Sequence, residues 1–274
     1  MRIYNHKYRS KLQVSEELGL LQSLQANGIS VAYPIANGSG EFIDEIIAPE
    51  GTRFAVLFSF AEGGKVRFLT AEMNRSIGVL MGRFHALTMY NSIGRIQYSV
   101  DVLAGWPYNQ LRKHFSEHFD EMPFIRTCER RLEQAFTALP RIRQGVVHLD
   151  IWYDNLSVRE DGQATLFDFD NCGNGWLILD IGYYCMQLYY TETDKLVYEL
   201  KKAAFIEGYR SVIPVSEEEL SLVPWAGLAI WIYYAGLQAE RFEHFANLFL
   251  SENYLRMYMG KVREWLKYHD LEIA

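Results

Sequence analysis

The stretch that decides how this chain folds is VVHLDIWYDNLSVREDGQATLFDFDNCGNGWLILDIGY, residues 146–183. It begins with a short apolar run before His148, and two later apolar runs, 156–158 and 164–167, flank Asp161-Gly162. An Asp-Gly pair between two such runs is a strong signal for a tight hairpin turn. We therefore predict a β-hairpin whose polar residues gather at the end opposite its turn.

Three of these polar residues converge at the open end of the predicted hairpin. Asn155 precedes the first strand, Asp168 follows the second, and Asp150 lies in the loop just before. Two carboxylates and an amide oxygen with no lysine among them repel one another unless a cation joins them. Oxygen ligands without cysteine or a second histidine favour Mg²⁺ over Zn²⁺, and Mg²⁺ usually shares its site with phosphates. The pattern indicates phosphoryl transfer. The alternative interpretation is a structural hairpin whose acidic ends are solvated, with His148 as an ordinary buried histidine.

Composition limits the remaining function classes. The chain has 274 residues, 49% of them hydrophobic, and a net charge of −7. This length allows a large buried core, and the acidic balance argues against a nucleic-acid partner, which would call for a basic surface. The three cysteines, Cys128, Cys172 and Cys185, match no metal-binding spacing, and Met1-Arg2-Ile3-Tyr4-Asn5 is not typical of a signal peptide. We expect a cytoplasmic protein.

One segment has the apolar character of a membrane span. Residues 220–237 carry no charge. However, Pro224 lies near the start of the segment, its aromatic residues lie in the middle rather than at the ends, and three glutamates precede it. We interpret it as a buried helix and expect no membrane partner.

The chain divides into a small first part and a large helical second part. Residues 1–62 predict a strand at 2–4, a helix over 14–25 capped by Ser15, and three further strands, with a hairpin turn at 37–40. Residues 63–274 are mostly helical by periodicity, with long helices expected at 183–209 and 217–247. We predict an α+β fold with two lobes, 1–62 and 63–274.

The segment His148-Leu149-Asp150-Ile151-Trp152-Tyr153-Asp154-Asn155 resembles the catalytic loop of kinase-like folds. Together with Phe167-Asp168-Phe169-Asp170 and Asp180-Ile181-Gly182, it is similar to the aminoglycoside phosphotransferase and choline kinase superfamily. The resemblance implies a two-lobe, protein-kinase-like fold that uses ATP and Mg²⁺ to phosphorylate a hydroxyl group of a small molecule. The alternatives are a Ser/Thr protein kinase of the stress-response type and a pseudokinase-like scaffold.

The resemblance also implies roles for single residues of the large lobe. Asp150 is expected to be the catalytic base, and Asn155 and Asp168 are expected to hold the metal, with Asp170 as a possible additional ligand. His148 is expected to lock the catalytic loop from beneath, and Asp180 to brace it by accepting backbone N–H groups.

In the small lobe, the resemblance implies a nucleotide site. Arg2 occupies the position of the phosphate-binding lysine, and Glu17 that of the helix glutamate that orients it. Ser59, Phe60 and Ala61 lie in the expected hinge, whose backbone would contact adenine; the alternative is a plain buried strand. Arginine is not equivalent to lysine here, because its guanidinium is a planar fork rather than a point charge.

The resemblance further implies two strands and a phosphate-covering loop ahead of Arg2, where this sequence begins. Either the protein starts further upstream, or it is a lobe-truncated relative with weakened ATP binding. For the chain as given, we expect the N-terminal residues to be mobile or paired with a second copy of the chain through the exposed N-terminal strand. The aromatic residues of the large lobe do not select an acceptor, which could be an amino alcohol, an amino acid or a sugar-like compound.

Overall fold

The structure is a computed structural model that describes residues 1–6, 8–139, 141–242, 249–271 and 273. Its helices and strands confirm the predicted α+β class. The chain forms two compact units: unit 1 is Met1–Ile96, Gly145–Asn174 and Leu188–Pro214, and unit 2 is Gln97–Gln144, Gly175–Gln187 and Val215–Ala274. Unit 1 is thus assembled from three separate stretches of chain. The lobe boundary after residue 62 stays a prediction.

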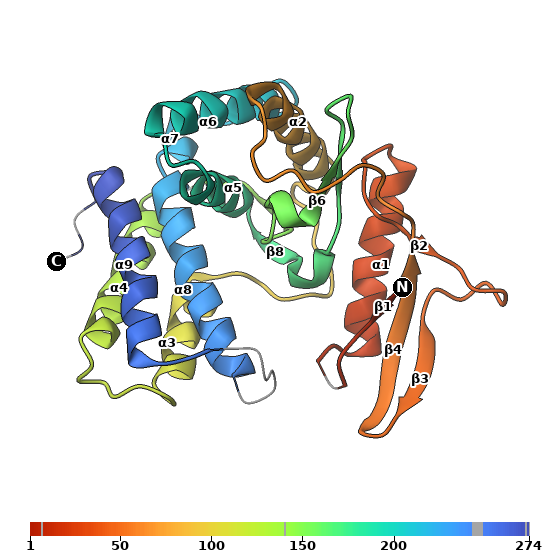
Figure 1. Ribbon diagram of the computed structural model, residues 1–274, viewed down its shortest axis with the longest axis horizontal. Coiled ribbons are helices and arrows are strands. Elements are labelled where there is room, and N and C mark those ends of the chain that lie inside the picture. Colours follow the sequence, from red (N-terminus) through yellow and green to blue (C-terminus); the bar gives the residue numbers. More distant parts are fainter. Residues whose placement is uncertain (7, 140, 243–248, 272, 274) are drawn as a thin grey trace. The chain divides into compact units, whose positions relative to one another are not determined.

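The sheet of unit 1 is organised around one long strand, β4 (Gly51–Phe58) (Figure 1). Strand β1 (Arg2–Ile3) pairs antiparallel with one edge of β4, while β2 (Pro34–Ile35) and β3 (Asp44–Ala48) pair with the other edge in succession. The hairpin predicted at 37–40 is therefore wrong, since its flanking strands do not pair with each other. The side-chain oxygen of Asn37 accepts the N–H groups of Ser39 and Glu41 and closes a local loop instead.

Helix α1 (Lys11–Ala26) packs its apolar face on this sheet. Val14 and Leu18 form a buried cluster with Tyr4 and Val56. The helix begins earlier than predicted because Ser10, not Ser15, is its N-cap. The side chains and backbones of Ser10 and Gln13 form a reciprocal capping box, with hydrogen bonds of 3.0 and 3.2 Å.

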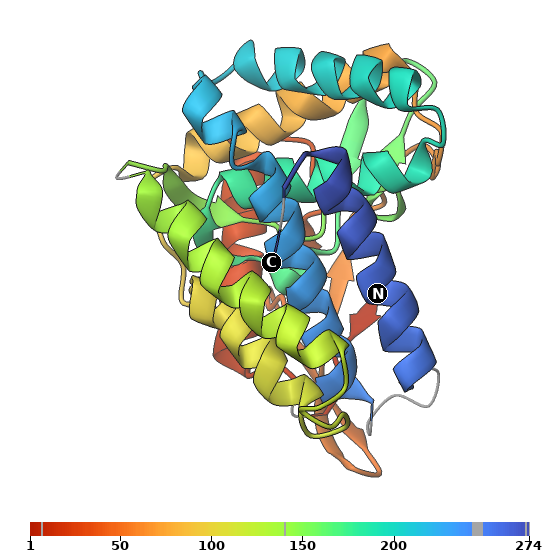
Figure 2. The same ribbon diagram turned by 90° about the vertical axis from the view of Figure 1, so that its left-hand side faces the viewer.

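A helix pair, α2 (Ala71–Thr88) and α6 (Lys195–Arg210), forms another layer of unit 1, and both views show the two helices side by side (Figures 1 and 2). They approach closely because the contact is made by glycines. A Cβ at Gly78 would overlap the carbonyl oxygen of Phe205, and a Cβ at Gly208 would overlap that of Arg75. Residues 192–194 separate α6 from α5 (Ile178–Thr191), so the single helix predicted over 183–209 is wrong.

Unit 2 is built mainly from helices, listed here with a preceding π-helical turn: η1 (Asp101–Gly105), α3 (Trp106–Leu111), α4 (Glu121–Ala138), the part of α5 up to Gln187, α7 (Glu217–Leu220), α8 (Val223–Arg241) and α9 (Glu252–Tyr268). Helices α4, α8 and α9 pack against one another (Figure 2). The predicted helix over 217–247 is divided into α7 and α8, and its residues 243–247 lie outside the described ones. The segment Glu217–Arg241 is long and apolar enough to cross a membrane, but 67% of its most apolar window is buried, as expected for a core helix.

Candidate active site

The predicted hairpin at residues 156–167 is confirmed. Strands β6 (Leu156–Val158) and β7 (Ala164–Leu166) pair antiparallel, with Leu156 opposite Leu166. At the turn, Gly162 has φ +81° and the side chain of Asp161 accepts the N–H of Gln163. At the open end, the N–H of Phe167 donates to the carbonyl oxygen of Asn155 at 3.1 Å. The residue that precedes Asp168 is thereby bonded directly to Asn155.

Four hydrogen bonds join this open end to the preceding loop in a closed ring. The N–H of Asp150 donates to Nδ1 of His148 at 3.1 Å, so Nε2 carries the ring proton and donates to the carbonyl oxygen of Phe167 at 3.1 Å. Phe167 donates to Asn155 as described, and Nδ2 of Asn155 donates to the carbonyl oxygen of Asp150 at 2.9 Å. We call His148, Asp150, Asn155 and Phe167 the hydrogen-bonded ring.

Backbone strain marks both sides of this ring. Leu149 has φ +61°, and Asp168 has φ +62° and ψ +65°. Left-handed backbone is uncommon outside glycine, and a buried leucine there is a genuine outlier. The surrounding hydrogen bonds hold these two conformations. They set the directions of two side chains, that of Asp150, which follows Leu149, and that of Asp168 itself.

Asp168 and Asp170 together contact three arginines. Nη1 of Arg2 lies 2.6 Å from Oδ1 of Asp168, and its Nη2 lies 3.4 Å from Oδ1 of Asp170. Arg9 approaches the same oxygen of Asp170 at 3.2 Å and donates to its carbonyl oxygen at 2.9 Å. Arg95 also donates to that carbonyl oxygen. Burial by itself would raise the pKa of Asp170, but the arginines outweigh it and hold that pKa below its ordinary value.

The cluster is completed by Glu17 on α1. Its carboxylate lies 3.4 Å from Nη1 of Arg95, and both side chains are almost fully buried. Burial raises the pKa of Glu17, although the charges of Arg2 and Arg95 oppose the shift. We call Arg2, Arg9, Arg95, Glu17, Asp168 and Asp170 the arginine cluster. Three guanidinium groups meet three carboxyl groups in it, so its charges nearly balance.

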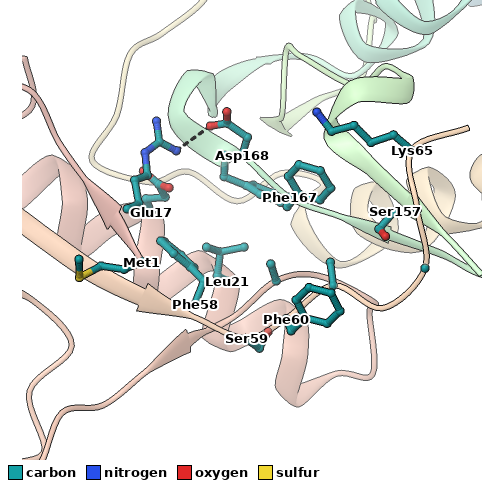
Figure 3. A pocket seen from close by; sticks show the side chains of 16 residues that line it. Met1, Glu17, Leu21, Phe58, Ser59, Phe60, Lys65, Ser157, Phe167 and Asp168 are labelled. Atoms are coloured by element: carbon teal, nitrogen blue, oxygen red, sulfur yellow. Dashed lines mark hydrogen bonds and ion pairs between the residues drawn. The ribbon is translucent and has the colours of Figure 1, made fainter. Parts of the chain in front are cut away.

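A cavity of about 650 Å³ lies within unit 1 beside the arginine cluster (Figure 3). Figure 3 shows apolar side chains, including Leu21, Phe58 and Phe60, on one side of the cavity and Asp168 on another. The volume falls in the usual range for small-molecule sites. The complete lining is Met1, Arg2, Glu17, Leu21, Ala32, Phe58, Ser59, Phe60, Ala61, Gly63, Gly64, Lys65, Ser157, Phe167, Asp168 and Phe169.

The segment predicted as a hinge forms one wall of this cavity. The last contact with the β2 segment is made by Ser59. Its N–H donates to the carbonyl oxygen of Tyr33, the residue before β2, at 2.8 Å. The segment is then attached to the hairpin: Gly64 and Val158 exchange two backbone hydrogen bonds of 3.0 and 2.9 Å. Gly63 has φ +106°, and a Cβ there would overlap the carbonyl oxygen of Val158. The close attachment therefore requires glycine at position 63.

The polar groups at the cavity fit a hard divalent cation. The amide nitrogen of Asn155 is used by Asp150, so its oxygen is the group left for a ligand. Asp168 has a side chain that is 43% exposed and lines the cavity, and all these donors are oxygens, as Mg²⁺ requires. The described residues hold no group of three or more His, Cys, Asp or Glu side chains arranged for a metal. Such a cation would thus need further oxygens, such as those of phosphates.

Most residues singled out from the sequence gather in unit 1. Arg2, Glu17, Ser59, Phe60, Ala61 and Asp168 line the cavity, and His148, Asp150 and Asn155 belong to the ring next to Asp168. Asp170 is not among the residues that line the cavity, and its carboxylate is bound by Arg2 and Arg9. Asp180 lies buried in the first turn of α5, in unit 2.

Sequence reasoning missed Arg9, Arg95 and Lys65. Arg9 and Arg95 hold the backbone after Asp168, and Lys65 lines the cavity. Neither arginine occurs in a recognisable motif, and each would ordinarily be read as a solvated surface charge. Lys65 follows Gly63-Gly64 directly, and that glycine pair was the available signal that its position is fixed.

The chain matches a known protein family and several known proteins. The model of the phosphotransferase enzyme family, APH, matches residues 1–215. A homoserine kinase of Agrobacterium fabrum is 33% identical over 211 residues, which are 76% of this chain and 62% of that protein. An uncharacterized protein of Deinococcus radiodurans is 25% identical over 98% of this chain and 79% of its own length.

Two solved structures share the fold. An amicoumacin kinase in complex with AMP-PNP, Ca²⁺ and Ami superposes with a TM-score of 0.78 at 23% identity, covering 97% of this chain and 80% of that one. A microcompartment-associated aminopropanol kinase gives a TM-score of 0.78 at 17% identity, covering 100% and 87%. The family match spans well over half of the chain, and both neighbours confirm the protein-kinase-like fold. The chain therefore belongs to the phosphotransferase enzyme family, a family of small-molecule kinases.

Proposed function

We propose that this chain transfers the γ-phosphoryl group of ATP to a hydroxyl group of a small, amine-bearing molecule, in the presence of Mg²⁺. The observation that carries the proposal is the hydrogen-bonded ring. It fixes Asp150 and Asn155 beside Asp168, and Asp168 lines a cavity of nucleotide size. Family membership supports the same class of reaction.

The cavity has the two kinds of surface that a nucleotide needs. Leu21 and Phe58 provide apolar contacts for a flat base, and the backbone of residues 60–63 makes no hydrogen bond to other backbone groups in the described part of the chain. Those peptide groups are therefore available to the edge of adenine. We place the phosphates toward Asp168 and Arg2, because the charged groups of the lining are found there.

In this proposal Asp150 accepts or orients the proton of the acceptor hydroxyl, and the hydrogen-bonded ring holds its backbone in place. His148 is a positioning residue, because both of its nitrogens are used within the ring. Asn155 and Asp168 would hold Mg²⁺, which when bound neutralises phosphate charge. Arg2 would exchange its contact with Asp168 for one with a phosphate.

The acceptor class is suggested by the relatives. The named ones are a homoserine kinase, an aminopropanol kinase and an amicoumacin kinase. Homoserine and aminopropanol each carry an amino group and a hydroxyl group. We propose an acceptor of this kind, phosphorylated in the cytoplasm. We propose separately that two copies of the chain pair through β1.

Two measurements test the function. Calorimetric titration with AMP-PNP and Mg²⁺ should show saturable binding, and an assay of ADP release across a panel of amino alcohols and hydroxy amino acids should show acceptor-dependent turnover. Asp150→Asn is the control, which should bind the nucleotide but not turn over. A chain that binds no nucleotide would exclude the kinase and favour the scaffold alternative.

A further inference from the structure

The mouth of the cavity carries a cation that has no assigned role. Among the described residues that line the cavity, those with cationic side chains are Arg2 and Lys65. Lys65 directly follows the Gly63-Gly64 attachment to Val158, so its backbone position is fixed by two hydrogen bonds. In the view of Figure 3, its ammonium group extends toward the side of the cavity where Asp168 lies.

The two cations differ in how far their charge is already compensated. Arg2 faces two carboxylates of the arginine cluster, Asp168 at 2.6 Å and Asp170 at 3.4 Å. Lys65 has an ion pair with Asp154, 3.1 Å from Nζ to Oδ1, and its side chain is 58% exposed. An exposed ion pair contributes little stability and is easily exchanged for another partner.

We infer that Lys65 is a second nucleotide-binding residue, which leaves Asp154 and contacts the phosphates of ATP at the cavity mouth. The inference rests on the proposed function, because it assumes that a nucleotide occupies the cavity. Its physical basis is that a polyanionic phosphate chain attracts an ammonium group more strongly than the single exposed carboxylate of Asp154 does. Lys65 thus supplies positive charge that Arg2 cannot supply without giving up its own partners.

The chain offers a matched control. Lys11 on α1 also belongs to unit 1 and is paired with one exposed carboxylate, Glu45, at 2.8 Å. Its side chain is 57% exposed, almost the same as that of Lys65, but it does not line the cavity. Lys11→Gln therefore removes the same charge and the same kind of ion pair without touching the nucleotide.

The test is calorimetric titration of the full chain with ATP, ADP and adenosine, each with Mg²⁺. Lys65→Gln should weaken ATP binding about tenfold, weaken ADP binding less and leave adenosine binding unchanged. Lys11→Gln should leave all three affinities unchanged. Asp154→Asn should tighten ATP binding, because it removes the group that competes with phosphate for Lys65.

The opposite signs expected for Lys65→Gln and Asp154→Asn separate a binding role from a structural one. If the ion pair only stabilised the loop, both variants would weaken binding of all three ligands alike, and the inference would be overturned. It would also be overturned if Lys65→Gln behaved like Lys11→Gln. If the parent chain bound neither ATP nor adenosine, both the proposed function and this inference would fail. If the parent chain bound ATP and Lys65→Gln bound it equally well, only this inference would be overturned.

Discussion

The hydrogen-bonded ring and the arginine cluster meet at Asp168 and hold it by different forces. The ring consists of neutral hydrogen bonds between residues 148 and 167 of a continuous stretch of chain. The cluster consists of charges brought together from chain positions as far apart as Arg2 and Asp170. The ring thus fixes the backbone before Asp168, while the cluster fixes its carboxylate and the residues that follow.

The difference shows how a site can be rigid and still exchange partners. Neutral hydrogen bonds to backbone groups offer few alternatives, because a broken bond leaves a buried group unsatisfied. The carboxylate of Asp168 is partly exposed, and its arginine partner can be replaced by another cation. We expect the ring to stay unchanged on ligand binding and the Arg2–Asp168 pair to rearrange.

The largest effect is expected at Asp150, the acidic side chain that the ring positions. Asp150→Asn should lower kcat about 10²–10⁴-fold while leaving nucleotide affinity nearly unchanged, because the amide keeps the shape but cannot accept the proton. Steady-state kinetics combined with AMP-PNP titration measures both quantities. Equal losses of turnover and affinity would show that the residue has a structural role.

The next effect concerns the centre of the arginine cluster. Asp170→Asn removes the carboxylate that faces Arg2 and Arg9, and an uncompensated buried charge is costly. We expect a loss of about 3 kcal/mol in the free energy of unfolding. Urea denaturation at 50 mM and 1 M NaCl measures the loss, which should be smaller at high salt. A variant as stable as the parent would show that solvent, not Asp170, balances these arginines.

A smaller loss is expected when the ring is broken. His148→Phe keeps an aromatic ring of similar shape but leaves the N–H of Asp150 and the carbonyl oxygen of Phe167 without their partner. We expect a loss of about 2 kcal/mol in the free energy of unfolding. The same urea experiment should give equal losses at both salt concentrations, because the broken hydrogen bonds are neutral. A marked salt dependence would contradict this distinction between ring and cluster.

The smallest effect concerns competition for Asp168. Because Arg2 contacts its Oδ1, the guanidinium competes with a divalent cation for this carboxylate. Arg2→Met keeps an unbranched side chain without the charge, and it should tighten binding of Mn²⁺ alone about tenfold, or about 1.4 kcal/mol. Electron paramagnetic resonance titration without nucleotide measures free Mn²⁺ directly. An unchanged affinity would place the cation away from Asp168.

The parts of the site that could be predicted from the sequence are those set by local spacing. The positions of His148, Asp150, Asn155 and Asp168 follow from one loop and one hairpin, and Asp161-Gly162 marks the turn. The α+β class was likewise predictable, because strand-length runs precede a long series of helical periods. The capping box at Ser10 and Gln13 was also predictable, because a Ser followed three residues later by a Gln is its sequence signature.

The arginine cluster could not be predicted, because it depends on how distant segments meet. A single arginine such as Arg9 or Arg95 carries no periodic or spacing signal, and its partners lie in another stretch of the chain. The pairing of β2 with β4 was missed for the same reason, since adjacent strands in sequence were expected to pair. The sequence likewise does not show that Arg2 and Arg9 lie beside Asp170, whose role as an additional metal ligand stays a prediction.

Arg2 and Asp170 are 168 positions apart, a separation that has a consequence for synthesis on the ribosome. At about 5–20 residues per second, the partners of Arg2 emerge roughly 8–34 s after it does. During that interval, Arg2 and Arg9 lack their carboxylates, and the nascent sheet around β4 lacks the hairpin to which its end is attached. The cavity thus cannot form co-translationally from the first part of the chain, and the early segment is expected to be a substrate for chaperones that shield exposed apolar surface.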